Sequence, residues 1–506
     1  MDDVPTTDLL TSFRNYVREE NRWTLLLLGL IPGYVLVVPS LSFIPALDPY
    51  NEKRVLQIGL LLTVGVVLLA FTEPRRAWLT TFGRLPRFTR GGLAVVLGLG
   101  LLSSALAPAP FYAVLEVAHV VLLFVAAGAV ASVVRRGRDQ LQWVLLGTVV
   151  LSGLLYAVYF AASYAAFVVI PGLDVGRETI SGFANIRHFN QYQTWTLPLF
   201  AGIVLSLPRR WRVGKGLAFG LVALWWALVF ASNVRGTVVA MGVAAVGVGL
   251  LYWWRAKNWL LVQAAGLLLG FGLYHFLFST GTAPPVADKF GEVSPDSRRI
   301  QHWRVCLEMA WAHPILGIGP MHFAWLPYPF TEPASPHSAL MQWLAEWGVP
   351  STIAMVGLAV WGGWRWMKQE RETESTTNGV PDAISVALVA SVLAGAAHSM
   401  VSGLILAPLS QMLLVLVGGW AWGRYRHADR STEMGSSLRS HVLLGALLLG
   451  SVVFVGGSLR DLSTVEERRS AFREATDHRN RLSPRYWAQG YIGVRNSSDT
   501  EQHQTD

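Results

Sequence analysis

The sequence predicts an all-α, polytopic integral membrane protein, and two observations carry that prediction. Hydrophobic residues occupy 52% of the 506 positions and charged residues only 14%, whereas soluble domains carry about 25% charged residues. The apolar residues gather in about thirteen runs of spanning length, separated by polar loops. We therefore expect about 12–13 transmembrane helices and one large outer loop that contains an amphipathic helix.

The predicted spans are residues 23–47, 54–72, 91–107, 111–134, 140–170, 192–207, 216–232, 236–253, 259–279, 339–364, 383–400, 404–423 and 441–458. They divide the chain into a cytoplasmic N-terminus (1–22), helices one to nine (23–279), a large outer loop (280–337), helices ten to thirteen (338–458) and an outer tail (459–506). The tail reads as a short charged helix followed by SPRYWAQGYI, a small outer appendage.

Every second loop between the predicted spans is basic, which sets the orientation. Examples are Arg75, Arg76, Arg135, Arg136, Arg209, Arg210, Arg255, Lys257 and Arg424. Positive loops remain in the cytoplasm, so the N-terminus and the even-numbered loops are expected there and the odd-numbered loops outside. The net charge of +9 is explained by these loops rather than by nucleic-acid binding.

Several functional classes find no support in the residue pattern. A single cysteine, Cys306, excludes an internal disulfide and a cysteine-based metal site. No zinc spacing, phosphate-binding loop or dinucleotide fingerprint is present, so we expect no metal and no nucleotide cofactor. Few acidic residues lie in the spans, which argues against a proton-coupled transporter. Glu116 and His119 lie three positions apart, and we expect them to form a structural buried pair.

Basic residues in outer loops run against the orientation rule, and each needs an explanation. Arg235 lies in NVRG, between two helices joined by almost no loop. It is either an arginine that snorkels to the interface or an anion site whose planar fork binds phosphate oxygens.

A second basic stretch, RHFNQYQTW, precedes the sixth span. Arg187 and His188 are accompanied there by Asn190 and Gln191 at the entrance of a helix, where anions are favoured. A capped, solvated loop is the alternative interpretation.

The large outer loop is predicted to contain an amphipathic helix that begins near Arg298 and Arg299. Ile300, Trp303, Leu307 and Trp311 fall at helical spacing and would form its apolar stripe. We expect Arg298 and Arg304 to be solvated. HPILGIGP then ends the helix.

His337 follows a proline at the start of the tenth span, in SPHSALMQWLAEWGV, with Glu346 nine residues later. A helix cap is one interpretation of this histidine. The other is proton transfer, since an imidazole titrates near neutral pH and a neighbouring guanidinium would keep it unprotonated.

Taken together, these stretches resemble the O-antigen ligase and polymerase superfamily of bacterial inner-membrane proteins. RIQHW with HPILGIGPMHF resembles the motif of the family's large periplasmic loop, SPHSALMQWLAEWGV its histidine motif, and NVRG its short arginine turn, where a serine usually precedes the arginine. The resemblance covers residues 180–420 in most detail.

The resemblance implies a GT-C-like scaffold and transfer of a glycan from undecaprenyl pyrophosphate at the periplasmic face. Arg235 and Arg299 would hold the pyrophosphate with help from Arg187 or His188, and His337 would be the catalytic base. Glu346, Asn190 and Gln191 would support the site. The reaction would invert the anomeric centre and need no metal.

The acceptor stays open between lipid A–core, which we prefer, a protein such as pilin, and a growing glycan. The RHFNQYQTW stretch resembles the corresponding asparagine-bearing loop of the protein-modifying branch, whose members often have a longer outer C-terminal domain than the short tail present here, so the sequence does not separate the branches. A flippase for the same lipid-linked sugars is the alternative of another class, and it would place charged residues deeper in the spans. A scaffolding membrane protein would leave the outer arginines and histidine unexplained.

Overall fold

The computed structural model describes residues 22–136, 138–173, 175–278, 298–325, 334–375, 382–425, 437–467, 470, 485–488, 490 and 492. These residues are helical or irregular, and the only strand-type pairing among them is an isolated bridge between Trp325 and Ile492. The all-α prediction is confirmed for this part of the chain.

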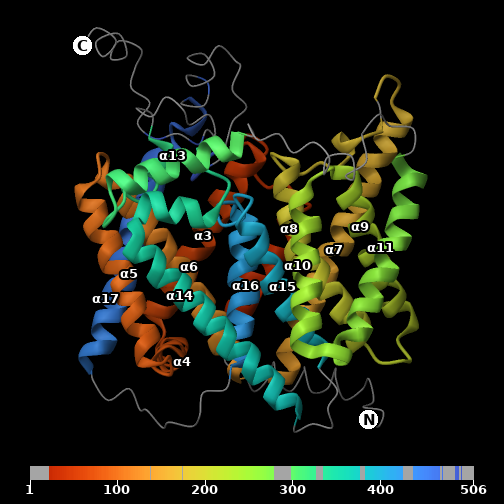
Figure 1. Cartoon of the computed structure of the whole chain (residues 1–506), viewed down its shortest axis with the longest axis horizontal. Helices are drawn as coiled ribbons and strands as arrows, with labels where there is room; N and C mark the ends of the chain where they lie inside the picture. Colours follow the sequence, from red (N-terminus) through yellow and green to blue (C-terminus); the bar gives the residue numbers. More distant parts are fainter. Residues whose placement is uncertain are drawn as a thin grey trace.

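Upright helices pack side by side into a bundle (Figure 1). A helix overlaps every predicted span: α2 (Arg22–Val37), α3 (Pro49–Ala70), α5 (Arg87–Leu106), α6 (Pro110–Arg136), α7 (Arg138–Val169), α8 (Ile186–Ser206), α9 (Arg212–Ser232), α10 (Arg235–Tyr252), α11 (Lys257–Phe278), α14 (Ala339–Ser375), α15 (Ala383–Ser399), α16 (Pro408–Arg424) and α17 (Ser437–Leu462). The sequence did not predict α4 (Thr72–Gly83), which lies at the lower end in Figure 1.

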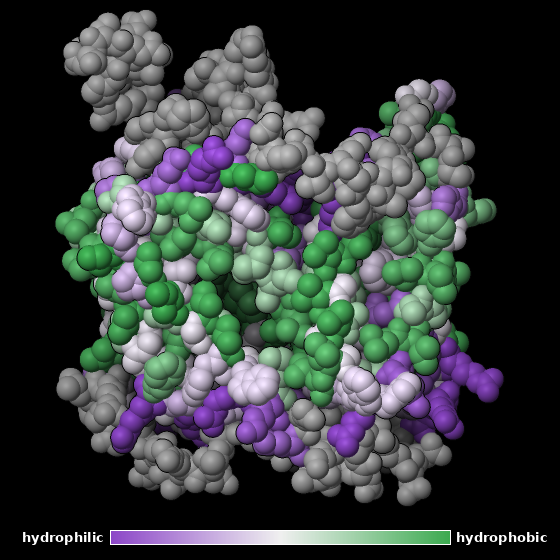
Figure 2. Space-filling model, in the orientation of Figure 1, coloured by the Kyte–Doolittle hydropathy of each residue, from purple (hydrophilic) through white to green (hydrophobic). Residues whose placement is uncertain are grey.

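Eight helical segments of the described chain are long and apolar enough to cross a membrane, one of which, Arg235–Phe278, comprises both α10 and α11. The other helices that overlap predicted spans either have fewer than 18 residues or, like α8, are rich in polar residues. On the face shown in Figure 2, a broad hydrophobic belt lies between two hydrophilic ends. The chain is therefore a multi-pass membrane protein.

The starts of α8, α10 and α14 lie at the upper end of the bundle in Figure 1, with α13 (Arg298–Ala312) lying across it. Local signals explain where two of these helices begin. Asn185 caps α8, since its side chain accepts a hydrogen bond from the backbone nitrogen of Arg187 at 2.9 Å. Asn233 has a φ of 52°, which closes the short turn from α9 to α10.

The predicted amphipathic helix exists as α13, and its predicted apolar stripe is not the face that packs against the rest of the protein. Ile300, Leu307 and Trp311 are exposed, Trp311 to 89%. The buried face instead consists of His302, Cys306, Met309 and Ala310. Both faces carry apolar residues, so helical periodicity alone cannot choose between them, and packing against α14 decided which one is covered.

Two further expectations differ from the structure. Glu116 and His119 do not pair with each other: Glu116 forms an ion pair with Arg485, and the His119 ring lies against Phe454 and Tyr486. The outer tail is no mere appendage either, because Arg485–Ala488 are buried. The predicted tail helix, residues 463–482, lies mostly outside the described residues.

Candidate active site

His337 lies in a strained loop immediately before α14. Its φ of 55° is in the left-handed region, where a residue other than glycine is uncommon. Trp303 of α13 fixes the loop by donating a hydrogen bond from its indole nitrogen to the carbonyl oxygen of Pro336 at 3.2 Å. The surroundings therefore hold His337 in an unfavourable backbone conformation. Strained backbone conformations of this kind are more frequent at functional sites than elsewhere.

Neighbouring residues account for the start of α14 without His337. The Ser338 hydroxyl accepts from the backbone nitrogen of Met341 at 3.5 Å, so serine rather than histidine supplies the cap. On the other side, Gly403 in the α15–α16 loop lies so close that a Cβ there would be 3.9 Å from Nδ1 of His337. The imidazole is thus half-buried between this loop and the basic residues of α8 and α13.

Basic side chains from several elements surround His337. Burial lowers the pKa of its imidazole to about 3, and the positive charges of Arg187 and Arg299 lower it further. His302 and His188 act in the same direction. Hence the imidazole is neutral at physiological pH.

The predicted arginines come together at this end of the bundle. Burial lowers the pKa of Arg299, and so do the charges of Arg187 and Arg235. These side chains begin at three separate elements, α8, α10 and α13. Three guanidinium groups that repel one another form a site that favours a multiply charged anion.

Arg235 is the first residue of α10, and the glycine after it permits close packing. A Cβ on Gly236 would come within 2.5 Å of Nε2 of His398 on α15. The other ring nitrogen of His398 lies 2.7 Å from the hydroxyl of Thr194 on α8. His398 therefore joins α8, α10 and α15 next to the first turn of α10, which Arg235 begins.

Asn190 and Gln191 are buried and connect the elements of the site. Nδ2 of Asn190 donates to the Ser232 hydroxyl at 2.8 Å, close to the turn that carries Arg235. Nε2 of Gln191 donates to the Ser402 hydroxyl at 3.2 Å, in the α15–α16 loop that also contains Gly403. Their supporting role in the site stays a prediction.

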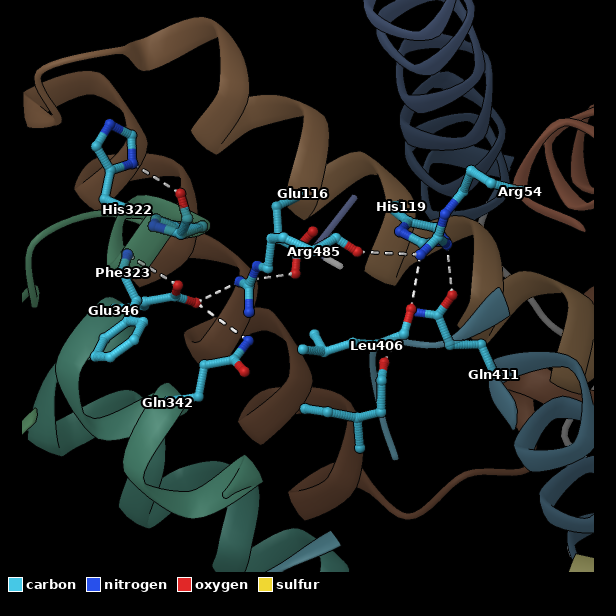
Figure 3. A network of polar contacts seen from close by, with 12 residues as sticks. Arg54, Glu116, His119, His322, Phe323, Gln342, Glu346, Leu406, Gln411 and Arg485 are labelled. Atoms are coloured by element: carbon cyan, nitrogen blue, oxygen red, sulfur yellow. Dashed lines mark hydrogen bonds and ion pairs between the residues drawn. The ribbon is translucent and has the colours of Figure 1, made fainter. Parts of the chain in front are cut away.

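His188 and Glu346 occupy different surroundings. The His188 ring lies 5.3 Å from the ring of Tyr50, centroid to centroid. Glu346 is fully buried: Oε1 accepts from the backbone nitrogen of Phe323 at 3.1 Å and Oε2 from Nη2 of Arg485 at 2.6 Å (Figure 3). Glu346 thus connects α14 to the backbone of Phe323 and to Arg485.

A kink in α14 receives the glycine-rich segment that follows α13. Gly348 has φ 77° and ψ 170°, which frees backbone carbonyl groups in the preceding turn. The nitrogens of Ile318 and Gly319 donate to the carbonyl oxygens of Ala345 and Glu346 at 2.9 and 3.1 Å. HPILGIGP is therefore docked on α14 by its backbone, and the glycines provide the close approach.

Among the described residues, no group of three or more His, Cys, Asp or Glu side chains is placed to hold a metal ion. Residues 217–356 match the protein family described as O-antigen ligase, Wzy_C. The chain carries an O-antigen ligase domain. No curated protein matches the chain in sequence.

The O-antigen ligase match covers Arg235, Arg299, His337 and Glu346. Arg187 and His188 lie before it on α8 and join the same cluster through the fold. Enzymes of this family transfer glycans, so lipid-linked glycans are the substrate class that the domain implies.

Sequence reasoning missed several residues of this region: Tyr50, His302, His398 and Arg485. His302 follows Arg299 at i+3 on α13, and this spacing indicates that both side chains lie on the same face of the helix. Tyr50, His398 and Arg485 are distant in sequence, and no local pattern connects them to His337.

Proposed function

We propose that the protein is an O-antigen ligase that moves a glycan from undecaprenyl pyrophosphate to lipid A–core at the periplasmic face of the bacterial inner membrane. The observation that carries the proposal is the convergence of Arg187 and Arg299 on the neutral imidazole of His337, with Arg235 acting in turn on Arg299. A diphosphate and a hydroxyl acceptor are the partners that this combination fits.

In the proposed reaction the guanidinium groups bind the pyrophosphate oxygens of the donor. The acceptor oxygen attacks C1 of the first sugar, the bond between C1 and the phosphate oxygen breaks, and the pyrophosphate leaves with the bonding electrons. The anomeric centre is inverted. Each fixed donor to the developing charge stabilises the transition state by about 3–4 kcal/mol, by analogy with oxyanion donors. The activated bond is already present in the donor, so the route needs no metal or nucleotide.

His337 takes the proton of the acceptor hydroxyl in this scheme. With a pKa near 3 the free imidazole is a weak base. Binding of the diphosphate neutralises the charges of Arg187 and Arg299, so the part of the lowered His337 pKa that these charges cause is removed and the pKa rises, while the larger part, caused by burial, stays. Binding of the donor therefore makes His337 a stronger base for the acceptor hydroxyl.

The same basic cluster supports a transferase over a flippase. A flippase needs polar or charged groups along a path through the membrane. Arg187, Arg299 and His337 instead act on one another, and they lie near the starts of α8, α13 and α14, which are at one end of the bundle (Figure 1).

The test uses purified protein, a synthetic undecaprenyl-pyrophosphate oligosaccharide and three acceptors in parallel: lipid A–core, a pilin-type protein and a lipid-linked glycan. We expect transfer to lipid A–core. Transfer to the protein or the glycan instead would assign the protein-modifying or polymerase branch. Binding of the donor without any transfer would favour the flippase.

The catalytic role is tested with His337→Asn beside His337→Ala, since asparagine tolerates positive φ better than alanine. Both variants are expected to insert and bind donor but to lose transfer by about 10²–10⁴-fold. Arg460→Ala is the control, because Arg460 is exposed at the end of α17 and lies over the Phe111 ring. Wild-type turnover in His337→Asn would remove the catalytic assignment.

A further inference from the structure

The C-terminal segment Arg485–Ala488 lies inside the helix bundle. Each of its four residues is at most 4% exposed. Arg485 is among the largest fully buried side chains of the described chain, although arginine is rarely buried completely.

One nitrogen of Arg485 connects two helices. Nη2 lies 2.6 Å from Oε2 of Glu346 on α14 and 3.3 Å from Oε1 of Glu116 on α6 (Figure 3). Removing one partner of such a buried pair is costly because the other charge stays desolvated, whereas apolar side chains could replace the whole pair at little cost. Stability alone is therefore a weak explanation for this arrangement.

Helix α3 holds the backbone of the segment from the other side. The Tyr50 hydroxyl donates to the carbonyl oxygen of Arg485 at 2.6 Å, and Nε of Arg54 donates to that of Tyr486 at 2.9 Å. The backbone nitrogen of Ala488 donates to Oδ1 of Asn51 at 2.7 Å. The segment is thus fixed in one position.

Two routes lead from this segment to the loops around His337. The first runs through Glu346, whose other oxygen accepts from Phe323 and whose helix begins beside His337. The second runs through Arg54, whose Nη2 donates to the carbonyl oxygen of Leu406 at 2.6 Å, in the α15–α16 loop that also contains Gly403. Figure 3 shows Arg54, Arg485 and Glu346 in one polar network.

A third contact reaches the basic cluster itself. Tyr50, which binds the Arg485 carbonyl oxygen through its hydroxyl, lies with its ring against His188. The segment therefore contacts elements on more than one side of the candidate site.

We propose that Arg485 is a positioning residue for glycan transfer: through Glu346 and the α3 contacts of its own segment it sets the loops that hold His337. This inference rests on the proposed function. The arginine touches no substrate, and its effect is on geometry. A displacement of about 1 Å at a reacting group can lower a rate by about 10²-fold.

The experiment compares wild-type enzyme with Arg485→Ala, Arg485→Lys and the double variant Arg485→Met with Glu346→Gln. The double variant is made in a Glu116→Gln background, so that all three charges of the network are removed and the volume is kept, and the glutamine at position 346 can still accept from the backbone nitrogen of Phe323. Arg460→Ala is the matched control at the same end of the bundle. Thermal unfolding, kcat, donor KM and hydrogen exchange of residues 334–338 and 400–407 are measured for each protein.

We expect the double variant to unfold near the wild-type temperature, with kcat lowered about 10-fold or more, little change in donor KM and faster exchange in both loops. Arg485→Lys is expected to recover much of kcat relative to Arg485→Ala. Both ion-pair contacts use Nη2 alone, and a single ammonium nitrogen can replace it.

A folded double variant with wild-type kcat and wild-type exchange would overturn the inference. A uniform loss of stability with unchanged kcat in the folded fraction would do the same, because it would show a purely structural role. Absence of transfer by the wild-type enzyme contradicts the proposed function instead, and the exchange rates then still decide whether Arg485 sets these loops.

Discussion

At the scale of single residues, the candidate site depends on positive charges held close together. Arg187 and Arg299 act on His337, and Arg235 acts on Arg299. Repulsion among these positive charges destabilises the protein without ligand, and a bound anion removes that repulsion. The same residues thereby destabilise the free site and favour the donor.

Arg235→Lys tests whether Arg235 binds oxygens through its planar fork. Lysine keeps the charge but cannot form two parallel hydrogen bonds. We expect donor KM to rise about 10-fold or more, measured with the synthetic donor. Arg209→Lys, exposed in the loop before α9, is the control that should leave KM unchanged. Wild-type KM in Arg235→Lys would argue against a bidentate phosphate contact.

Acid stability tests the surroundings of His337. Its folded pKa of about 3 lies below the ordinary value of 6.5, so between these values the unfolded chain binds a proton that the folded protein excludes. The free energy of unfolding is therefore not reduced by His337 above pH 6.5, and it falls as the pH drops from 6.5 toward 3. At pH 5 the loss is on the order of 1–2 kcal/mol.

The measurement is thermal unfolding of wild type and His337→Gln in detergent at pH 7.5 and pH 5. The wild-type unfolding temperature is expected to fall more than that of the variant, since glutamine takes up no proton. Equal shifts in the two proteins would mean that His337 is not held neutral by its neighbours.

At the scale of secondary structure, the kink in α14 joins the motif after α13 to the helix that follows His337. Gly348→Ala would force a side chain onto a φ of 77° and against the carbonyl group of Ile315. We expect a loss of about 1–3 kcal/mol from strain alone together with reduced transfer.

Gly357→Ala is the matched control on the same helix, because a Cβ at that position meets no atom within 4 Å. It should be neutral or stabilise α14 by up to about 1 kcal/mol. Thermal unfolding of the two variants gives the comparison, and equal stability would show that the kink at Gly348 is not required.

At the scale of the whole molecule, every element of the site lies at one end of the bundle, and the orientation in the membrane decides what that end meets. Basic loops predict that this end is periplasmic. Cys306, the single cysteine of the sequence, is buried, so Cys306→Ser gives a background for labelling.

In that background, cysteine is introduced at exposed His313 after α13 or at exposed Arg212 at the start of α9. A membrane-impermeant maleimide applied to intact spheroplasts is expected to label position 313 and to reach position 212 only after lysis. The reverse pattern would invert the orientation and would place the candidate site in the cytoplasm.

The sequence by itself determined the helical membrane architecture and most candidate residues. Apolar runs of spanning length must be helical in a bilayer, because the backbone has no other way to satisfy its hydrogen bonds there. Arg235, Arg299 and His337 were found because basic residues outside are exceptions to a strong rule. Their roles in transfer remain predictions.

Only the tertiary structure decided which face of α13 is covered, which partners Glu116 and His119 take, and that Arg485 belongs to the frame of the site. Arg485 and Glu346 are 139 positions apart along the chain, yet they form a contact of 2.6 Å. Hydrophobic periodicity reports how each helix meets an apolar environment, whether lipid or protein. The pairing of distant buried groups depends on how the helices pack, and local sequence patterns do not contain that information.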